Sequence, residues 1–272
     1  MTEATGDDLL RRAENGVLWL TLNRPDVRNA ITQDQRDRLI ALLAGASADP
    51  QVRAVVLTAT GAGFCTGADL RRPPGEEARP GQAPERRPGD VARVVGGAQR
   101  LVAAVQDCEK PVIAAVNGTA AGIGVHLALA CDLVIAAEGV RFIEVFARRG
   151  LVPDGGGAYL LTRLVGPQKA KELMLFGDDL SAGEALALGL VNRVVPAGEL
   201  EKTAREWAER LATGPTRSYA LTKWLVNRAL ESSREACFAD EAAAQELNMA
   251  TADAAEGVRA FLERRPPRFT GR

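Results

Sequence analysis

The sequence predicts an α/β fold whose C-terminal region is entirely helical. Short apolar runs that suit buried strands recur between residues 17 and 195, and helical patterns follow most of them. From residue 199 onward, apolar side chains recur with helical spacing almost to the end of the chain. We therefore expect a core at residues 1–197 and a helical region at 198–272 that covers the core and supports oligomer formation.

The composition is that of a soluble globular protein. Hydrophobic residues make up 46% of the 272 residues, and the formal net charge of −1 argues against a nucleic-acid partner that needs a large basic face. No apolar run approaches the length of a membrane span, and the N-terminus MTEATGDDLL is acidic rather than signal-like. Four cysteines lie far apart without a CxxC pair, so we expect no metal site, no disulfide framework and a cytoplasmic location.

The first third of the chain contains two strand patterns and a helix pattern. The run GVLWLTL at 16–22 predicts a strand, and Thr32 with Gln35 has the spacing of a capping box that begins a helix. The run at 53–58 is almost continuously apolar, which favours a strand buried on both faces. Residues 71–90 are crowded with Pro, Gly and charge, so we expect a mobile surface loop there.

The middle of the chain repeats the same order of patterns. A helix is expected at 91–105, and strands are expected at 112–116, 133–136 and 190–195. Further helical segments are predicted at 159–165, 168–176, 182–188, 199–212, 216–231, 234–250 and 252–264.

The same sequence pattern occurs in two stretches, residues 61–70 (GAGFCTGADL) and residues 117–132 (NGTAAGIGVHLALACD). In each, a strand ends in small residues, and a helical turn is expected to follow. Such corners leave backbone N–H groups free to bind an anion or an oxyanion. Two of these donors on one carbonyl oxygen would stabilise an enolate, each being worth about 10²–10³ in rate. The alternative is a pair of tightly packed corners without function.

Ten short motifs follow one another along the chain. They are NRP at 23–25, Arg28-Asn29-Ala30, GFCTGADL at 63–70, AVNG at 115–118, CD at 131–132, GLVPDGG at 150–156, EA at 184–185, GLVN at 189–192, EGV at 256–258 and AFLERR at 260–265. In their order and spacing the chain resembles the crotonase (enoyl-CoA hydratase/isomerase) superfamily, on its isomerase-leaning branch. The resemblance implies a spiral of repeated ββα units and a homotrimer or hexamer. It also implies an acyl-CoA substrate, with coenzyme A as part of the substrate thioester and no permanently bound cofactor.

The resemblance also assigns binding residues. Ala68 and Ile123 fall where the family's oxyanion-hole amides sit, while Arg28 and Ala30 fall on the segment that lines the CoA nucleotide pocket.

Two further binding residues lie near the C-terminus. Phe261 and Arg264 fall where a neighbouring subunit often holds the adenosine and phosphates. The alternatives are surface charges at Arg28 and Arg264 and a core residue at Phe261.

The departures from the family pattern concern catalysis. The resemblance implies that a hydratase of this family uses two glutamates in catalysis. In this sequence His126 stands at the first glutamate position and Phe146 at the second. Phe146 indicates an apolar acyl pocket. Glu144 lies two residues before Phe146, and no spacing argument places it in the pocket.

Asp154 is the remaining candidate for proton transfer, because the isomerase-leaning branch uses an aspartate at this point. A buried carboxylate with a raised pKa can take a proton from one carbon and return it to another. The alternative is a simple Pro-Asp-Gly turn. His126 is either a second acid–base group or a partly buried residue that shapes the acyl pocket.

The predicted function is isomerisation or hydration of an enoyl-CoA through a thioester enolate. A catalytically weak acyl-CoA-binding homologue is one alternative, which the missing glutamates favour, and a thioester hydrolase or dehalogenase-like member is another. RNA binding occurs in some relatives of the fold, but the near-neutral charge and the lack of a basic–aromatic stripe argue against it here.

Overall fold

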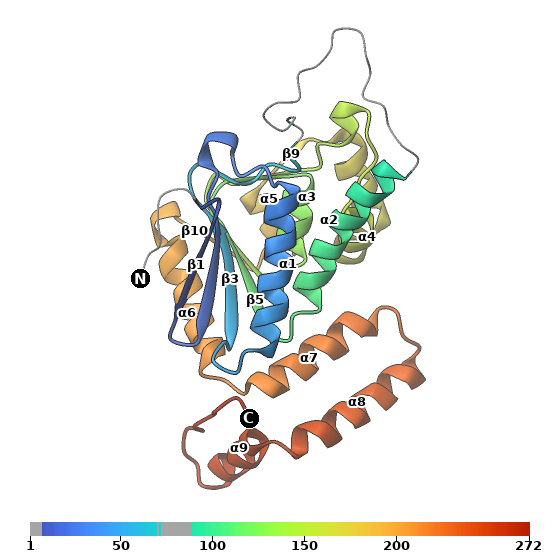
Figure 1. Cartoon of the computed structure of the whole chain (residues 1–272). Coiled ribbons are helices and arrows are strands. Elements are labelled where there is room, and N and C mark those ends of the chain that lie inside the picture. The colour runs from blue at the N-terminus through green and yellow to red at the C-terminus, as the bar shows by residue number, and fades with distance from the viewer. Residues whose placement is uncertain (1–6, 70, 72–88) are drawn as a thin grey trace, which may run out of the picture.

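The computed structural model describes residues 7–69, 71 and 89–272 (Figure 1). Most of the predicted surface loop, residues 72–88, therefore lies outside the described residues.

Six strands form the larger sheet of the described chain, in the order β1-β2-β3-β5-β7-β10. All neighbours are parallel except β1, which pairs antiparallel with β2 at one edge. The strands are β1 (Leu9–Glu14), β2 (Val17–Leu22), β3 (Ala54–Ala59), β5 (Val112–Val116), β7 (Leu133–Ala137) and β10 (Arg193–Val195). The central strand β5 is buried along its whole length, as its continuous apolar run predicts.

A second sheet of four short strands has the order β4-β6-β8-β9. Its strands are β4 (Gly63–Cys65), β6 (Thr119–Ala121), β8 (Arg141–Ile143) and β9 (Asp179–Ser181). The chain passes from β3 to β4, from β5 to β6 and from β7 to β8, and a helix follows each pair. Each ββα unit thus adds one strand to both sheets, which confirms the expected spiral.

The core helices begin largely where the sequence predicts. They are α1 (Gln33–Ala48), α2 (Asp90–Gln106), α3 (Ile123–Leu129), α4 (Gly157–Phe176) and α5 (Ala182–Ala187), with short 3₁₀ turns η1 (Pro25–Val27), η2 (Ala147–Arg149) and η3 (Ala197–Glu199). Thr32 caps α1 by accepting the Gln35 N–H at 3.1 Å. The capping box stays half-formed, because the Gln35 side chain donates to the Asp8 carbonyl instead, at 2.6 Å. Helix α4 kinks at Gly166, which separates the two predicted helical segments.

The C-terminal helices are α6 (Leu200–Ala212), α7 (Thr216–Ala229), α8 (Arg234–Met249) and α9 (Ala252–Leu262). Helix α6 packs against the large sheet, whereas α7, α8 and α9 lie below the core (Figure 1). An ion pair between Lys223 on α7 and Asp132, at 2.8 Å, joins this helical region to the core. The division of the chain at 197–198 remains a prediction.

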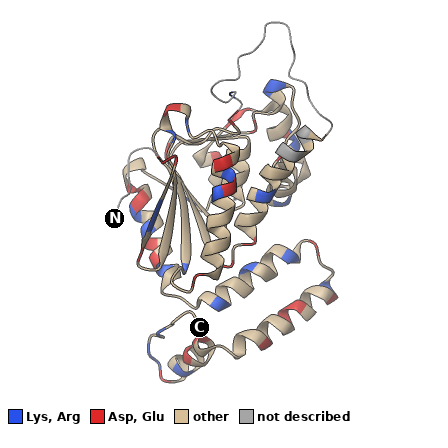
Figure 2. Cartoon of the chain, in the orientation of Figure 1, with Lys and Arg blue, Asp and Glu red and all other residues tan. Residues whose placement is uncertain are grey.

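In Figure 2, Lys and Arg positions and Asp and Glu positions both occur along the helices of the described chain. None of the described helices combines the length and apolarity needed to cross a bilayer.

Candidate functional site

Ala68 and Ile123, from the two small-residue stretches, line one pocket with a volume of about 300 Å³. Its walls combine apolar side chains with a few polar ones. The lining residues are Ile31, Thr32, Gln33, Arg36, Gly67, Ala68, Asp69, Ala98, Leu101, Gly122, Ile123, Val145, Phe146, Arg149, Leu151 and Asp154. A larger groove of about 630 Å³ lies between α7, α8 and the core, and no predicted site residue lines it.

Ala68 is held in an extended conformation beside Ile31. The Ile31 N–H donates to the Gly67 carbonyl, and the Asp69 N–H donates to the Ile31 carbonyl, both at 2.9 Å. The intervening Ala68 N–H bonds to no described residue. The expected helical turn at Ala68 is therefore wrong, because pairing with Ile31 keeps the chain extended.

Ile123 is the first residue of α3, where a backbone N–H has no partner within the helix. Its amide bonds to no described residue, whereas the preceding Gly122 N–H donates to the Ile143 carbonyl at 3.0 Å. A Cβ atom at Gly124 would lie 1.9 Å from the Cys65 carbonyl oxygen. Only glycine allows α3 to approach the end of β4 this closely, which brings the two corners to one pocket.

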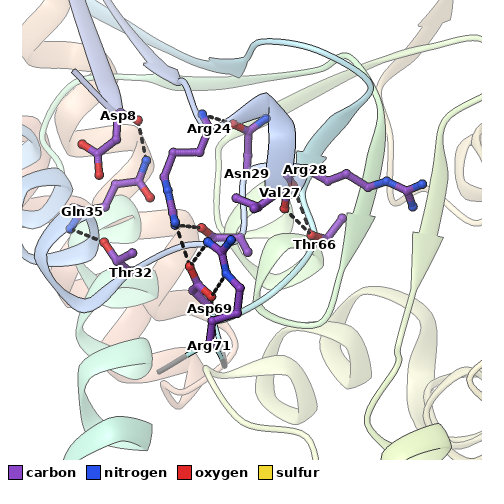
Figure 3. A network of polar contacts seen from close by, with 11 residues as sticks. Asp8, Arg24, Val27, Arg28, Asn29, Thr32, Gln35, Thr66, Asp69 and Arg71 are labelled. Atoms are coloured by element: carbon purple, nitrogen blue, oxygen red, sulfur yellow. Dashed lines mark hydrogen bonds and ion pairs between the residues drawn. The ribbon is translucent and has the colours of Figure 1, made fainter. Parts of the chain in front are cut away.

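A polar cluster holds the carboxylate of Asp69, the residue after Ala68 (Figure 3). Arg71 donates to both Asp69 oxygens, at 2.8 and 2.6 Å, and Arg24 Nη2 donates to Oδ2 at 2.8 Å. The hydrogen bonds from Arg71, and then those from Arg24, lower the pKa of Asp69 although burial opposes them. Arg24 Nη1 also donates to the Ala30 carbonyl at 2.6 Å.

Asp154 lines the same pocket from the loop that precedes α4. The residue is half-buried, and burial raises the pKa of its carboxyl group. The charge of His126 lowers this pKa, and the charge of Glu144 raises it. Asp154, Ala68 and Ile123 thus line the same pocket.

His126 is fully buried on α3 and is not among the residues that line the pocket. Its Nε2 atom lies 3.0 and 3.2 Å from the two carboxylate oxygens of Glu144. The Phe146 ring stacks parallel to the imidazole, with centroids 5.6 Å apart, and itself lines the pocket.

Sequence reasoning named Glu144 but missed its contact with His126. Parallel pairing of β6 with β8 places Ala121 beside Ile143, so residue 144 comes next to the start of α3. The available signal in the sequence was a glutamate directly after the apolar pair Phe142-Ile143, in a chain that has a single histidine.

Cys65 lies three residues before Ala68 and is completely buried. Burial raises the pKa of its thiol to about 11, so it is not a thiolate nucleophile near neutral pH. Within the described ranges, no group of three or more His, Cys, Asp or Glu side chains could hold a metal ion.

The chain matches a family of known proteins along almost its whole length. A family model described as Enoyl-CoA hydratase/isomerase matches residues 12–272. The chain belongs to the enoyl-CoA hydratase/isomerase family. It is an enzyme of this family, since proteins similar to it over nearly its full length are named as a hydratase and an isomerase.

Two curated Escherichia coli relatives cover nearly the whole hydratase/isomerase chain. The 1,2-epoxyphenylacetyl-CoA isomerase is 39% identical, over 97% of this chain and 98% of its own length. The 2,3-dehydroadipyl-CoA hydratase is 34% identical, over 97% of this chain and 99% of its own length. The crystal structure of an enoyl-CoA hydratase from Bacillus anthracis superposes with a TM-score of 0.89 at 32% identity, covering 98% of this chain and all of that one.

The predicted CoA-binding residues of this hydratase/isomerase lie outside the pocket. Arg28 is exposed and extends away from Arg24 and Asp69 (Figure 3), and Ala30 precedes the pocket-lining Ile31.

Phe261, at the end of α9, is 82% exposed, and Arg264 beyond it is also exposed. Helix α9 lies below the core (Figure 1), so the chain does not bring these two residues to its own pocket. Their predicted role, contact with the site of a neighbouring subunit, remains a prediction.

Proposed function

We propose that this enzyme shifts the double bond of an enoyl-CoA through a thioester enolate. The Ala68 and Ile123 amides bind the thioester oxygen, and Asp154 carries the proton. The observation that supports this proposal is that one pocket is lined by two residues whose amides lack described partners and by a half-buried carboxyl group.

The proposed reaction needs one base and one oxyanion site. The Asp154 carboxylate takes a proton from the α-carbon of a 3-enoyl-CoA, and the electron pair moves onto the thioester oxygen. The resulting dienolate is bound by the two amides. Asp154 then returns its proton to the γ-carbon, the double bond moves to the 2-position, and the carboxylate is regenerated.

Hydration is the second candidate, because the relatives include hydratases. Asp154 would then activate water. Asp69 is the other described carboxylate in the pocket, and its ion pairs with Arg71 and Arg24 make it a poor proton donor.

The remaining parts of the proposal concern binding and assembly. Arg28 and Ala30 contact the CoA nucleotide, while Phe261 and Arg264 reach it from a neighbouring copy in a homotrimer or hexamer. Phe146 lines the acyl pocket, and His126 assists from behind it. The enzyme works in the cytoplasm without nucleic acid, membrane or a permanently bound cofactor.

The test is to incubate the protein with 2-enoyl- and 3-enoyl-CoA in heavy water and to locate the deuterium. Isomerisation labels the α- or γ-carbon, whereas hydration gives a 3-hydroxyacyl-CoA. Asp154→Asn should abolish turnover but retain CoA-ester binding, whereas Asp178→Asn at an exposed site should change neither.

Wild-type turnover in Asp154→Asn would refute the role of Asp154. Tight binding by the wild-type protein without label or product would identify an acyl-CoA-binding homologue instead. Free coenzyme A released with the acid would identify a hydrolase.

A further inference from the structure

Arg36 places a positive charge in the wall of the pocket. It lies near the start of α1 and lines the pocket together with Ala98 and Leu101 of α2, the helix that packs beside α1 (Figure 1). The Arg36 side chain is only 11% exposed, so little of it meets bulk water. The charge is therefore part of the pocket and not of the outer surface.

A glycine on α2 sets the position of this guanidinium. A Cβ atom at Gly97 would lie 2.1 Å from Arg36 Nη1 and 2.4 Å from Cζ, so the guanidinium occupies the space that a side chain at residue 97 would fill. At the preceding Gly96, an added Cβ atom would have nothing within 4 Å. The close approach of Arg36 to the α2 backbone thus depends on glycine at position 97.

The guanidinium is only partly paired within the described chain. Its Nε atom donates to Asp37 Oδ1 at 2.9 Å, and Nη2 lies 2.9 Å from the same oxygen. Asp37 is exposed, and exposed ion pairs contribute little. Nη1 donates to no described residue. Because a guanidinium carries five N–H donors, some of them remain for a ligand in the pocket.

The other charged residues of the pocket do not neutralise Arg36. Asp69 already accepts hydrogen bonds from two other arginines, and Asp154 enters from the loop before α4. Neither carboxylate forms an ion pair with Arg36 in the described structure. Arg149, which is exposed on η2, adds a second positive charge to the lining.

These donors disfavour a plain alkyl chain in the pocket. Such a chain would remove water from the N–H groups of Arg36 without replacing their hydrogen bonds, which costs free energy. A carboxylate at the end of the acyl chain would accept hydrogen bonds from the planar guanidinium, a pairing for which arginine is well suited. A volume of about 300 Å³ lies at the lower end for ligand pockets, so it suits an acyl group and not the whole coenzyme.

We propose that Arg36 selects acyl-CoA substrates whose acyl chain ends in a carboxylate, the CoA monothioesters of dicarboxylic acids. This inference rests on the proposed function, because it takes the thioester oxygen to lie at the Ala68 and Ile123 amides. It adds the substrate class and a specificity-determining residue for the same pocket.

The test measures the binding of saturated thioesters, which requires no turnover. Isothermal titration calorimetry compares the Kd of adipyl-CoA with that of hexanoyl-CoA, and the Kd of suberyl-CoA with that of octanoyl-CoA. Each pair shares its chain length, and the two pairs differ in the distance from thioester to carboxylate. The wild-type protein should bind the dicarboxylic member of at least one pair about 10- to 100-fold more tightly. Equal Kd values within both pairs would overturn the proposal.

The decisive variant is Arg36→Met, which keeps a long side chain and removes the charge. It should weaken binding of the dicarboxylic thioester and thereby remove the preference, without weakening its alkyl partner. Equal weakening of both would mean that Arg36 supports packing or binds the coenzyme, and this result also overturns the proposal. So would a preference that Arg149→Met removes and Arg36→Met retains. The control is Arg38→Met on the same helix, whose partners are Asp7 and Asp8, and it should retain the preference.

A second variant retains the charge and moves it. In Gly97→Ala the new methyl group displaces the guanidinium, which is the end of a flexible side chain, and alanine favours a helix over glycine. The protein should therefore fold and lose most of the preference. Gly96→Ala is the matched control, because it brings the same gain in helix propensity without a contact, and it should bind as wild type does. A full preference in Gly97→Ala would contradict the proposed position of Arg36.

Failure of this inference differs from failure of the proposed function. If Asp154→Asn remains active, the proposed function fails, while a preference that disappears in Arg36→Met still supports the role of Arg36. If deuterium labelling supports isomerisation by Asp154 and the wild-type protein shows no preference, this inference alone fails.

Discussion

The guanidinium of Arg24 donates to the Asp69 carboxylate at 2.8 Å and thereby joins two segments that lie 45 residues apart. The same side chain donates to the Ala30 carbonyl. Arg24 therefore bonds to the residue next to each partner of the Ile31–Ala68 β-bridge, Ala30 beside Ile31 and Asp69 beside Ala68. This contact gives the NRP motif a physical role: it holds in place the extended segment that carries Ala68, a residue of the pocket wall.

Loss of the Arg24–Asp69 contact should lower kcat more than it raises KM. Arg24→Met leaves Asp69 with Arg71 alone, which we expect to cost about 1–3 kcal/mol of unfolding free energy. A displaced Ala68 amide should lower kcat about 10- to 100-fold, with a much smaller change in KM. Urea unfolding and steady-state kinetics measure both effects. Arg141→Met, which removes an exposed ion pair with Asp179, is the control and should change neither by much.

The same cluster predicts a loss of stability in acid. Because the folded protein lowers the pKa of Asp69, this group stabilises the fold at pH values above its ordinary pKa, near 3.8. That contribution disappears as the pH falls below this value toward the folded-state pKa. Asp69→Asn should therefore unfold with a weaker pH dependence than wild type below about pH 4 in urea titrations. Parallel curves for the two proteins would contradict this account.

Gly124 should not tolerate a side chain. In Gly124→Ala the new methyl group would meet the Cys65 carbonyl, a backbone atom that cannot rotate away. We expect a loss of about 1–3 kcal/mol in unfolding free energy and a fall in kcat as the two amides separate. Gly183→Ala is the matched control on α5, because nothing lies within 4 Å of its added Cβ. That change should be neutral or stabilise the protein by roughly 0.5–1 kcal/mol.

Thiol reactivity should follow burial. Cys237 on α8 is half-exposed, whereas Cys65, Cys108 and Cys131 are buried. Brief treatment of the native protein with iodoacetamide should label Cys237 first, and activity should survive. Mass spectrometry of the digested protein locates the label, and unfolding in urea should expose all four thiols. Rapid labelling of Cys65 in the folded protein would show that the β4 end opens.

Elements with a strong local pattern could be predicted from the sequence. The interior strands β3 and β5 are continuous apolar runs, and α6 to α9 carry clear helical patterns, so both kinds were expected near their observed bounds. Strand β1 was not predicted, because its sequence LLRRAE has a charged middle that suits an exposed edge. Three-residue strands such as β6 and β8 are too short for any periodicity to reveal.

The sequence by itself determined the family, the helical C-terminus and the candidacy of Ala68, Ile123 and Asp154. Only the tertiary structure placed these three around one pocket and joined His126 to Glu144, 18 residues away. The physical reason is that these contacts depend on the parallel register of two sheets and on close approaches at glycine, which are non-local. The sequence gives the type of each side chain, whereas tertiary packing determines which residues it contacts and how deeply it is buried.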